Sequence, residues 1–272
     1  MLHVTENIVP PSSLTLAATT GLRRLAEQDP DTAHLAAALR HLAKWRAELV
    51  ANTIAERMGP LISAGPFTGM TYGVRASEGS RAARLLGVYE ASLAPVIETI
   101  VARAYELVID IGSAEGYYAV GLARRMPQAR VLARDENPQA QQLCRTLADM
   151  NGVADRVEIG GRMDHADFAI CTSRPSVIIC DIEGAEEALL DPALAPGLSA
   201  ADILVECHDV LRPGLTDRLA ARFSASHHVT RINRQLAPLL PDWMEGWSDL
   251  DRLIALWEWR SGPTPWLWMT HK

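Results

Sequence analysis

The chain has 272 residues, 48% of them hydrophobic and 22% charged, which suits a soluble protein with one α/β domain and an extension. Its net charge of −7 argues against a nucleic-acid backbone as partner, and no run of about 18 apolar residues indicates a membrane-spanning helix. The first residues, MLHVTENIVPPSS, lack the basic start and apolar stretch of a signal peptide. With four scattered cysteines, these features predict a cytoplasmic protein with reduced thiols.

The first 60 residues carry a helical pattern rich in alanine and leucine. Asp29 and Pro30 are typical of an N-cap and a first helical position, and Gly59 with Pro60 should end that helix. We expect residues 1–75 to form a helical extension that serves as a lid or a dimer surface. Residues 76–272 should form the main domain, which opens with a helical stretch, RAARLLGVYEASLAPVIETIVAR.

From residue 106 onward, strand and helix patterns alternate. Strands are predicted at 107–110, 130–134, 156–159, 176–181 and 202–207. This alternation favours a parallel, doubly wound sheet. Near the C-terminus, HHVTRIN and RLIALWEWR look like two more strands with little room for a helix between them, which predicts a terminal antiparallel pair.

The first predicted strand runs into a glycine-bearing turn, ELVIDIGSAEG, followed by a helical run. Gly112 and Gly116 in such a turn let a ligand approach the backbone closely, and the helix N–H groups point at it. Asp135 follows the second predicted strand, where an acid can accept hydrogen bonds from both hydroxyls of a ribose. The pattern therefore predicts a nucleoside-type cofactor.

The spacing does not match the G-x-G-x-x-G fingerprint of dinucleotides, because Ala114 stands between the two glycines. Asp110 and Glu115 also bring negative charge to the turn, which disfavours a pyrophosphate. S-adenosylmethionine fits better, since it joins a ribose and an adenine to a sulfonium and an ammonium. Met163 and Asp164, after the third strand, are predicted to line the adenine.

The fourth and fifth strands end in further polar groups, and ligands in open α/β sheets bind at these carboxyl ends. His208 is the candidate general base, because histidine titrates near neutrality; alternatively it only braces Asp181. Asp181, Glu206 and Asp209 could gather magnesium, or could act only as hydrogen-bond acceptors.

Two further groups carry weaker expectations. His227 and His228 fall in a predicted edge segment, where both should face solvent. Six of the seven tryptophans lie in the C-terminal tail and could form an aromatic substrate wall, although packing explains them as well.

Two motifs resemble those of a known family. DIGSAEGYYAVGLA resembles motif I of class I S-adenosylmethionine-dependent methyltransferases, and DIEGAE resembles the D-[IV]-E-G-[AY]-E signature of FkbM-type methyltransferases. GPFTGMTYG, LLGVYEASL and WEWRSGPTPWL are similar to other segments of that group, so the likeness covers about residues 65–268. It implies a seven-stranded sheet of order 3-2-1-4-5-7-6 and methyl transfer, usually to oxygen, on sugars or secondary metabolites. Ala114 and Arg134 depart from the usual pattern.

We therefore predict a Rossmann-like α/β methyltransferase that methylates oxygen on a small molecule. The methionine end of S-adenosylmethionine would be held by Asp110, Gly112, Ser113, Glu115 and Gly116. Asp135 would hold the ribose, and His208 or Asp181 would help to remove the acceptor's proton. A homodimer stays open, whereas nucleic acid and membrane are not expected as partners.

Two alternatives stay open. An NAD-dependent oxidoreductase could use the same sheet, but Ala114 and the lack of a Tyr-x-x-x-Lys pattern disfavour it. A cofactor-binding partner protein without chemistry is disfavoured by His208 and the DIEGAE segment.

Overall fold

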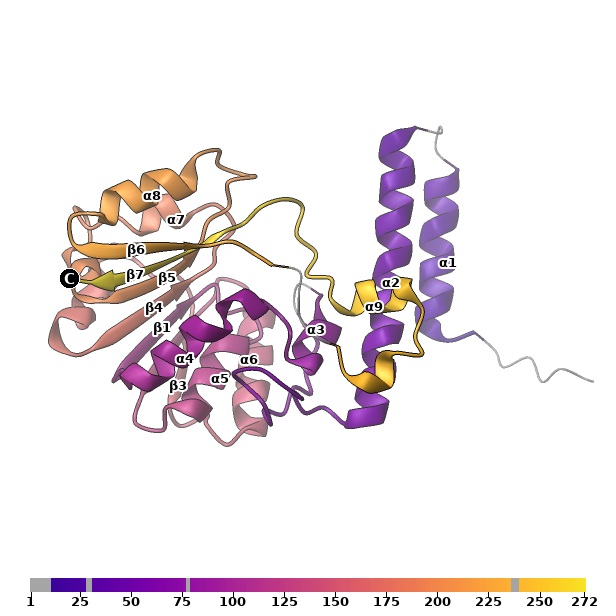
Figure 1. Ribbon diagram of the computed structural model, residues 1–272, viewed down its shortest axis with the longest axis horizontal. Coiled ribbons are helices and arrows are strands. Elements are labelled where there is room, and N and C mark those ends of the chain that lie inside the picture. The colour runs from indigo at the N-terminus through magenta and orange to yellow at the C-terminus, as the bar shows by residue number, and fades with distance from the viewer. Residues whose placement is uncertain (1–10, 28–30, 77–78, 236–239) are drawn as a thin grey trace, which may run out of the picture.

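The computed structural model describes residues 11–27, 31–76, 79–235 and 240–272. At its centre is a seven-stranded sheet of order β3-β2-β1-β4-β5-β7-β6 (Figure 1). The first five strands are parallel, and β7 runs antiparallel to both β5 and β6. The order confirms the predicted Rossmann-like sheet. The strands are β1 Leu107–Ile111, β2 Arg130–Arg134, β3 Val157–Gly160, β4 Ser176–Cys180, β5 Asp202–Glu206, β6 His227–Ile232 and β7 Trp266–His271.

Helices cover both faces of the sheet. Figure 1 shows α4, α5 and α6 on one face and α7 and α8 on the other. In the described part of the chain, the α-helices are α1 Ser13–Ala26, α2 Thr32–Met58, α3 Arg81–Leu86, α4 Ala94–Arg103, α5 Tyr117–Arg125, α6 Pro138–Met150, α7 Glu186–Leu189, α8 Leu215–Phe223 and α9 Asp249–Ala255.

The central strands are apolar on both faces because helices bury both. Successive side chains of a strand point to opposite faces. Accordingly, Val108 of β1 packs in the cluster under α4, α5 and α6, whereas Leu107 and Ile109 pack in the cluster under α8. All five residues of β1 are buried. A buried polar side chain at the end of such a strand is therefore held rigidly.

The N-terminal extension is a pair of helices, α1 and α2, as its periodicity predicts. Asp31 caps α2 and accepts a hydrogen bond from the backbone N–H of His34 at 2.7 Å. Asp29 and Pro30, predicted as the cap, lie outside the described residues. Gly59 ends α2 as expected.

The N-terminal helices also contact a helix from much later in the sequence. Figure 1 shows α9 beside α2, at one end of the molecule. Arg46 of α2 donates two hydrogen bonds to the carboxylate of Asp251 in α9, both at 2.6 Å. A segment close to the C-terminus thus completes the helical layer.

The helical stretch predicted at residues 81–103 is interrupted once in the structure. The segment ends α3 at Gly87, which has φ 71°, and resumes at residues 91–93 as a turn of 3-10 helix before α4. A Cβ on Gly87 would lie 1.9 Å from the carbonyl oxygen of Ala64, so this close approach of two backbone segments requires glycine.

The same segment is long and apolar enough, by length and composition, to cross a membrane. The most apolar stretch of 18 residues in it has a mean hydropathy of 1.5, and 39% of that stretch is buried inside the fold. Core helices of globular proteins meet the same criterion. The absence of a membrane partner stays a prediction.

Of the two strands predicted near the C-terminus, the first is confirmed and the second is wrong. HHVTRIN forms β6, which pairs antiparallel with β7 at the edge of the sheet. RLIALWEWR is not its partner, because its first part lies in α9. Ser248 caps that helix, accepting from the backbone N–H of Asp251 at 3.2 Å, and acids in the first turn favour the helix dipole.

The two edge histidines of β6 face opposite ways. His228 is exposed, as predicted. His227 is 1% exposed, and its Nε2 lies 2.8 Å from the carbonyl oxygen of Ala201, so the prediction that it faces solvent is wrong. Because side chains alternate along a strand, two neighbouring histidines cannot share one face.

Candidate active site

The ends of β1, β4 and β5 lie side by side and bring acidic groups together at one edge of the sheet. Asp110 stands in β1, 3% exposed, and one of its carboxylate oxygens, Oδ2, is buried without a hydrogen-bond partner among the described residues. Burial, with the charges of Asp181 and Asp135, raises the pKa of Asp110 to about 7, against the hydrogen bond it accepts from the backbone of Ala119. A positive charge beside this carboxyl group would favour its ionised form.

The turn after β1 approaches β4 so closely that only glycine fits. A Cβ on Gly112, at φ 79°, would lie 1.7 Å from the carbonyl oxygen of Asp181. Ala114, where the family pattern has glycine, adopts the left-handed φ of 47°. For a residue with a Cβ that conformation costs about 1–2 kcal/mol, so the surrounding contacts must hold it.

Asp135 is one of those contacts. One carboxylate oxygen, Oδ2, accepts a hydrogen bond from the backbone N–H of Ala114 at 2.9 Å, and the other accepts from that of Asn137 at 2.8 Å. Each oxygen keeps a second lone pair. The structure therefore places Asp135 at the turn, and its role towards a ribose stays a prediction.

Glu115, in the turn between Gly112 and Gly116, forms a buried ion pair with Arg84. Glu115 is fully buried; its carboxylate accepts from the hydroxyl of Tyr72 at 2.6 Å and lies 3.0 Å from the guanidinium of Arg84. Arg84 also donates to the carbonyl oxygen of Gly79 at 2.9 Å. Sequence reasoning missed Arg84, since an arginine in the apolar run RAARLL gives no sign of what it will face.

These groups line a small cavity. Its lining includes Arg84, Tyr89, Asp110, Gly112, Ser113, Ala114, Glu115, Tyr117, Tyr118, Ile179 and Asp181. Four of the residues predicted for the methionine end of the cofactor are in that set, and so is Asp181. The hydroxyl oxygen of Ser113 is a second buried atom there without a hydrogen-bond partner among the described residues.

The two neighbouring residues predicted to line the adenine have different surroundings, because Met163 is buried and Asp164 is exposed. Met163 is 3% exposed and packs in the apolar cluster on the α8 side of the sheet. Asp164 is exposed and caps the 3-10 helix His165–Ser173, and its carboxylate lies 3.3 Å from Arg162. Their role towards an adenine stays a prediction.

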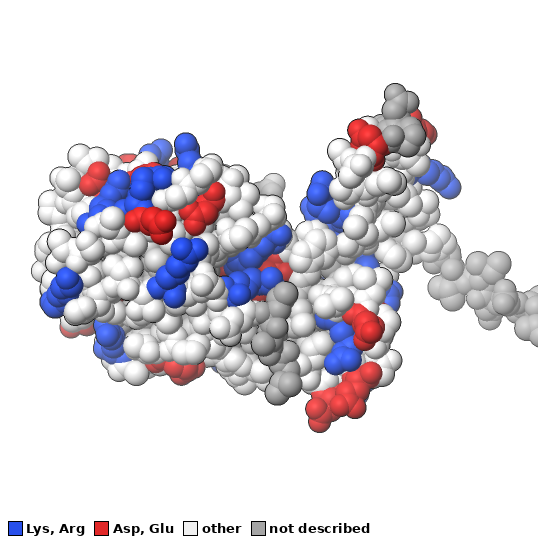
Figure 2. Space-filling view, turned by 45° about the horizontal axis from the view of Figure 1, so that its top comes forward, with Lys and Arg blue, Asp and Glu red and all other residues white. Residues whose placement is uncertain are grey.

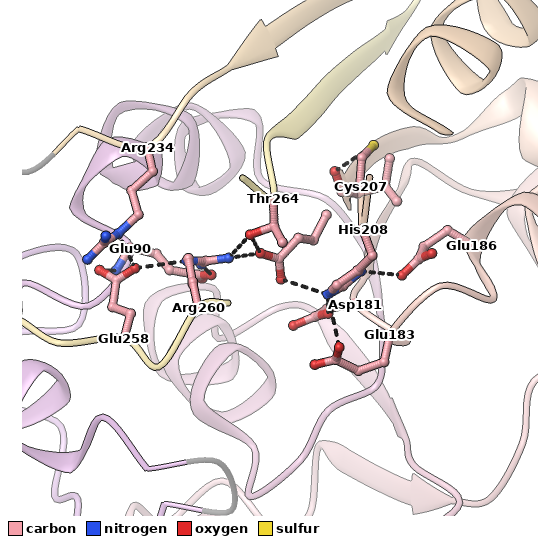
Figure 3. A network of polar contacts seen from close by, with 12 residues as sticks. Glu90, Asp181, Glu183, Glu186, Cys207, His208, Arg234, Glu258, Arg260 and Thr264 are labelled. Carbon is pink, nitrogen blue, oxygen red and sulfur yellow. Dashed lines mark hydrogen bonds and ion pairs between the residues drawn. The ribbon is translucent and has the colours of Figure 1, made fainter. Parts of the chain in front are cut away.

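His208 follows β5, and its imidazole is surrounded by the carboxylates of several acidic residues (Figure 3). Its Nδ1 is 2.7 Å from Oε1 of Glu186. Its Nε2 lies 3.3 Å from Glu183, 3.6 Å from Asp181 and 3.9 Å from Glu206. Burial lowers the pKa of this imidazole, but the hydrogen bond to Glu186 and the charges of Asp181, Glu186 and Glu183 outweigh it, so the pKa lies above its usual value.

Glu206, at the end of β5, is held from the other side. Oε1 accepts from the hydroxyl of Thr264 at 2.5 Å and is bonded by the guanidinium of Arg260. Arg260 also binds Glu90, and it donates to Glu258 at 3.1 Å. Figure 3 shows this chain of contacts from Glu90 to His208. Arg260 and Glu90 were not predicted, because they are far from Glu206 in the sequence.

Two of the three candidate magnesium ligands, Asp181 and Glu206, converge in the structure, and Asp209 is not part of that group. Asp209 accepts hydrogen bonds from the backbone N–H of Thr216 at 3.2 Å and from its hydroxyl, so it caps α8. The groups that do converge are Asp181, Glu206 and His208, with possible ligand atoms within 4.8 Å of one another. An imidazole nitrogen is not a ligand that magnesium prefers, so magnesium is not supported.

We expect magnesium to leave the stability of the protein unchanged. An ion that binds only the folded chain would raise its Tm, so unfolding curves of the full chain in excess EDTA and in millimolar magnesium should coincide. A Tm that rises with the magnesium concentration would contradict this.

Figure 2 shows how the charged side chains are distributed over one face of the described residues. On the face drawn in Figure 2, basic and acidic side chains lie interspersed. That nucleic acid is not a partner stays a prediction.

No family model and no curated protein matches the chain. Among solved structures it is similar to an O-methyltransferase from Bacillus cereus in complex with SAH, with 12% identity, a TM-score of 0.46, and coverage of 95% of this chain and 100% of that one. It is also similar to the C-terminal domain of precorrin-6Y C5,15-methyltransferase from Rhodobacter capsulatus, with 20% identity, a TM-score of 0.41, and coverage of 66% and 89%. Similarities this weak carry no functional argument, and the fold assignment rests on the strand order.

Proposed function

We propose that this protein is an S-adenosylmethionine-dependent methyltransferase that acts on an oxygen of a small molecule. The observation that carries the proposal is the pair of buried polar atoms at the Gly112–Gly116 turn, Oδ2 of Asp110 and the hydroxyl of Ser113. Buried polar atoms are normally hydrogen-bonded, so each such exception calls for a partner. An ammonium group in the cavity would supply that partner.

The charge of the cavity also favours a cationic cofactor. Asp110 and Asp181 line it, and Asp135 is bonded to the turn behind it. A sulfonium or ammonium would stabilise the ionised form of Asp110, whose pKa burial raises. Arg84, which also lines the cavity and pairs with Glu115, would lie near the cofactor's carboxylate. A pyrophosphate, with its negative charges, would meet these acids unfavourably.

The bound cofactor would supply the methyl group, and the protein's own residues would align the acceptor and handle its proton. Alignment is the larger part, because correct positioning of two reactants can lower a barrier by about 7–11 kcal/mol. Nε2 of His208, next to Asp181 and the cavity, would take the proton of the acceptor's hydroxyl. The DIEGAE segment and the FkbM-type resemblance favour a sugar or a secondary metabolite as acceptor.

Two alternative functions, an NAD-dependent oxidoreductase and a cofactor-binding protein without catalytic activity, are less well supported. An NAD-dependent oxidoreductase would need room for a pyrophosphate at a turn that carries Asp110 and Glu115. A cofactor-binding protein without catalytic activity would have no use for the arrangement of carboxylates around His208.

Calorimetry on the full chain tests the proposal. S-adenosylmethionine and its demethylated product should bind, and NAD should not. Asp110→Asn and Ser113→Ala should each weaken binding of S-adenosylmethionine, because each removes a polar partner worth roughly 1–3 kcal/mol. Asp217→Asn is the matched control, since its side chain is 89% exposed. Binding of NAD alone would overturn the proposal.

Asp135→Ala should lower the affinity for S-adenosylmethionine at least tenfold while the protein stays folded. The carboxylate would make charge-assisted hydrogen bonds to the ribose, each worth roughly 1.5–3 kcal/mol, and it also holds the backbone of Ala114. Asp135→Asn, which keeps one acceptor oxygen, should lose less. An unchanged Kd for Asp135→Ala, measured by calorimetry, would reject the assignment.

A further inference from the structure

We propose that Glu186 is a positioning residue for His208: it fixes the imidazole with its proton on Nδ1 and its free lone pair on Nε2, facing Asp181. The consequence for methyl transfer rests on the function proposed above. The geometry of the pair stands without it.

Glu186 is held more firmly than a carboxylate that merely neutralises a charge. It is fully buried, at the first position of α7. The same oxygen, Oε1, accepts from the backbone N–H of Gly184 at 3.0 Å and from that of Ile182 at 3.3 Å, besides the His208 contact. A carboxylate fixed by two backbone groups has one orientation, so it can dictate the orientation of its third partner.

The turn before Glu186 is shaped to supply those two backbone groups. Glu183 has φ 54° and Gly184 has φ 100°, so two successive residues lie in the left-handed region. For Glu183 this conformation costs free energy, which persists only where the surroundings demand it. Backbone N–H groups of the DIEGAE segment therefore hold the carboxylate of Glu186, the last residue of the segment.

The protonation of Glu186 decides which ring nitrogen carries the proton. Burial raises the pKa of this carboxyl group, but its hydrogen bonds to His208 and to the backbone outweigh burial, and the pKa lies below its usual value. The group is therefore an ionised carboxylate, which only accepts hydrogen bonds. Nδ1 must be the donor, and in the neutral ring Nε2 carries the lone pair.

Nε2 then points where a base is needed. Three carboxylates face it: Glu183 from the turn after β4, Asp181 from the end of β4 and Glu206 from the end of β5. They stabilise the imidazolium that forms when Nε2 takes a proton. Asp181 also lines the cavity beside Gly112 and Asp110, so Nε2 lies 3.6 Å from a residue that borders this cavity.

A purely structural role for Glu186 makes a different prediction from a positioning role. A brace would need only some hydrogen bond, and its loss would change stability alone. A positioning residue sets the tautomer and the pKa of His208. Both can be measured directly on the full chain by nitrogen NMR of labelled imidazoles, without knowledge of the acceptor. The signal of His208 is identified as the one missing from His208→Gln.

We expect the wild-type ring to be the Nδ1–H tautomer when neutral, with a pKa above its usual value. In Glu186→Gln the amide oxygen can still accept from Nδ1, so the tautomer should stay while the pKa falls by about one unit through loss of the charge. In Glu186→Ala the acceptor is gone, and the Nε2–H tautomer should become populated. Glu187→Gln is the matched control, because that neighbour bonds to Arg218 at 2.6 Å and not to His208.

Three outcomes would overturn the proposal: an Nε2–H tautomer in the wild type, a Glu186→Ala variant whose neutral ring stays entirely in the Nδ1–H tautomer, or a pKa of His208 in Glu186→Gln equal to that in the Glu187→Gln control. If Glu186→Ala fails to fold, Glu186→Gln still decides through the pKa. The measurement is separate from the proposed function, since a protein that binds no S-adenosylmethionine would fail in calorimetry and could still show the expected tautomer.

Discussion

His208→Ala should lower kcat by about 10²–10⁴ and leave the affinity for S-adenosylmethionine almost unchanged, because the variant lacks the group that takes the acceptor's proton. The imidazole contacts Glu186 through Nδ1 and lies 3.6 Å from Asp181 through Nε2, and it is not in the lining of the cavity beside Gly112. Turnover is measured as release of S-adenosylhomocysteine with an acceptor found in a panel of hydroxylated small molecules.

The pH profile gives a second readout. A base must be neutral, so the wild-type rate should rise with pH through the pKa of His208. The carboxylates around it raise that pKa, so the rise should lie above the ordinary histidine value of about 6.5 rather than at it. The same shift stabilises the folded protein below the unfolded pKa, and that contribution is lost as pH rises through the folded value.

His228→Ala is the control for this variant, because His228 is exposed on β6 and should leave both kcat and the pH profile intact. A His208→Ala protein that keeps more than about half of the wild-type kcat lies far outside general-base behaviour. His208 would then be a structural residue, and alignment or Asp181 would have to account for the reaction.

Glu115→Ala should destabilise the protein by about 3–5 kcal/mol, the usual cost of removing one partner of a buried ion pair. The side chains of Arg84 and Glu115 are only 4% and 0% exposed, and the hydroxyl of Tyr72 donates to the same carboxylate. The substitution therefore leaves a buried guanidinium facing an empty volume and takes away the acceptor of a buried phenol. The free energy of unfolding from urea titrations measures the effect.

An exposed ion pair provides the comparison. Glu98 binds Arg125 at 2.8 Å, but the two side chains are 52% and 33% exposed. Glu98→Ala should therefore cost less than about 1 kcal/mol. If Glu115→Ala cost no more than Glu98→Ala, the turn that carries Glu115 would not depend on the buried pair.

Most of the sheet could be predicted because its signals are local. Apolar runs such as Leu107–Ile111 alternate with helical patterns, and acids at strand ends must meet at one edge. Local signals fail where tertiary contacts decide. Residues 81–103 read as a helical stretch, yet the backbone of Ala64 packs against Gly87 and interrupts it. RLIALWEWR reads as a strand, yet the cap at Ser248 starts a helix there.

The candidate site divides in the same way. Asp110, Gly112 and Asp181 could be found, because each follows or ends a strand in a recognisable motif. Arg84 and Arg260 could not, since each binds a carboxylate that stands far away in the sequence. For Asp209 the sequence left two roles open, a magnesium ligand or a hydrogen-bond acceptor, and in the structure it accepts from the backbone N–H of Thr216 in α8.

The contact between Arg46 and Asp251 has a consequence for how the chain folds. The two residues are 205 positions apart, so the helical layer closes only after the segment that carries α9 has been synthesised. The pair of α1 and α2 is local and can form early, whereas its docking to α9 must wait for loop closure over that distance. During synthesis on the ribosome, the apolar side of α2 therefore stays accessible to chaperones until α9 emerges.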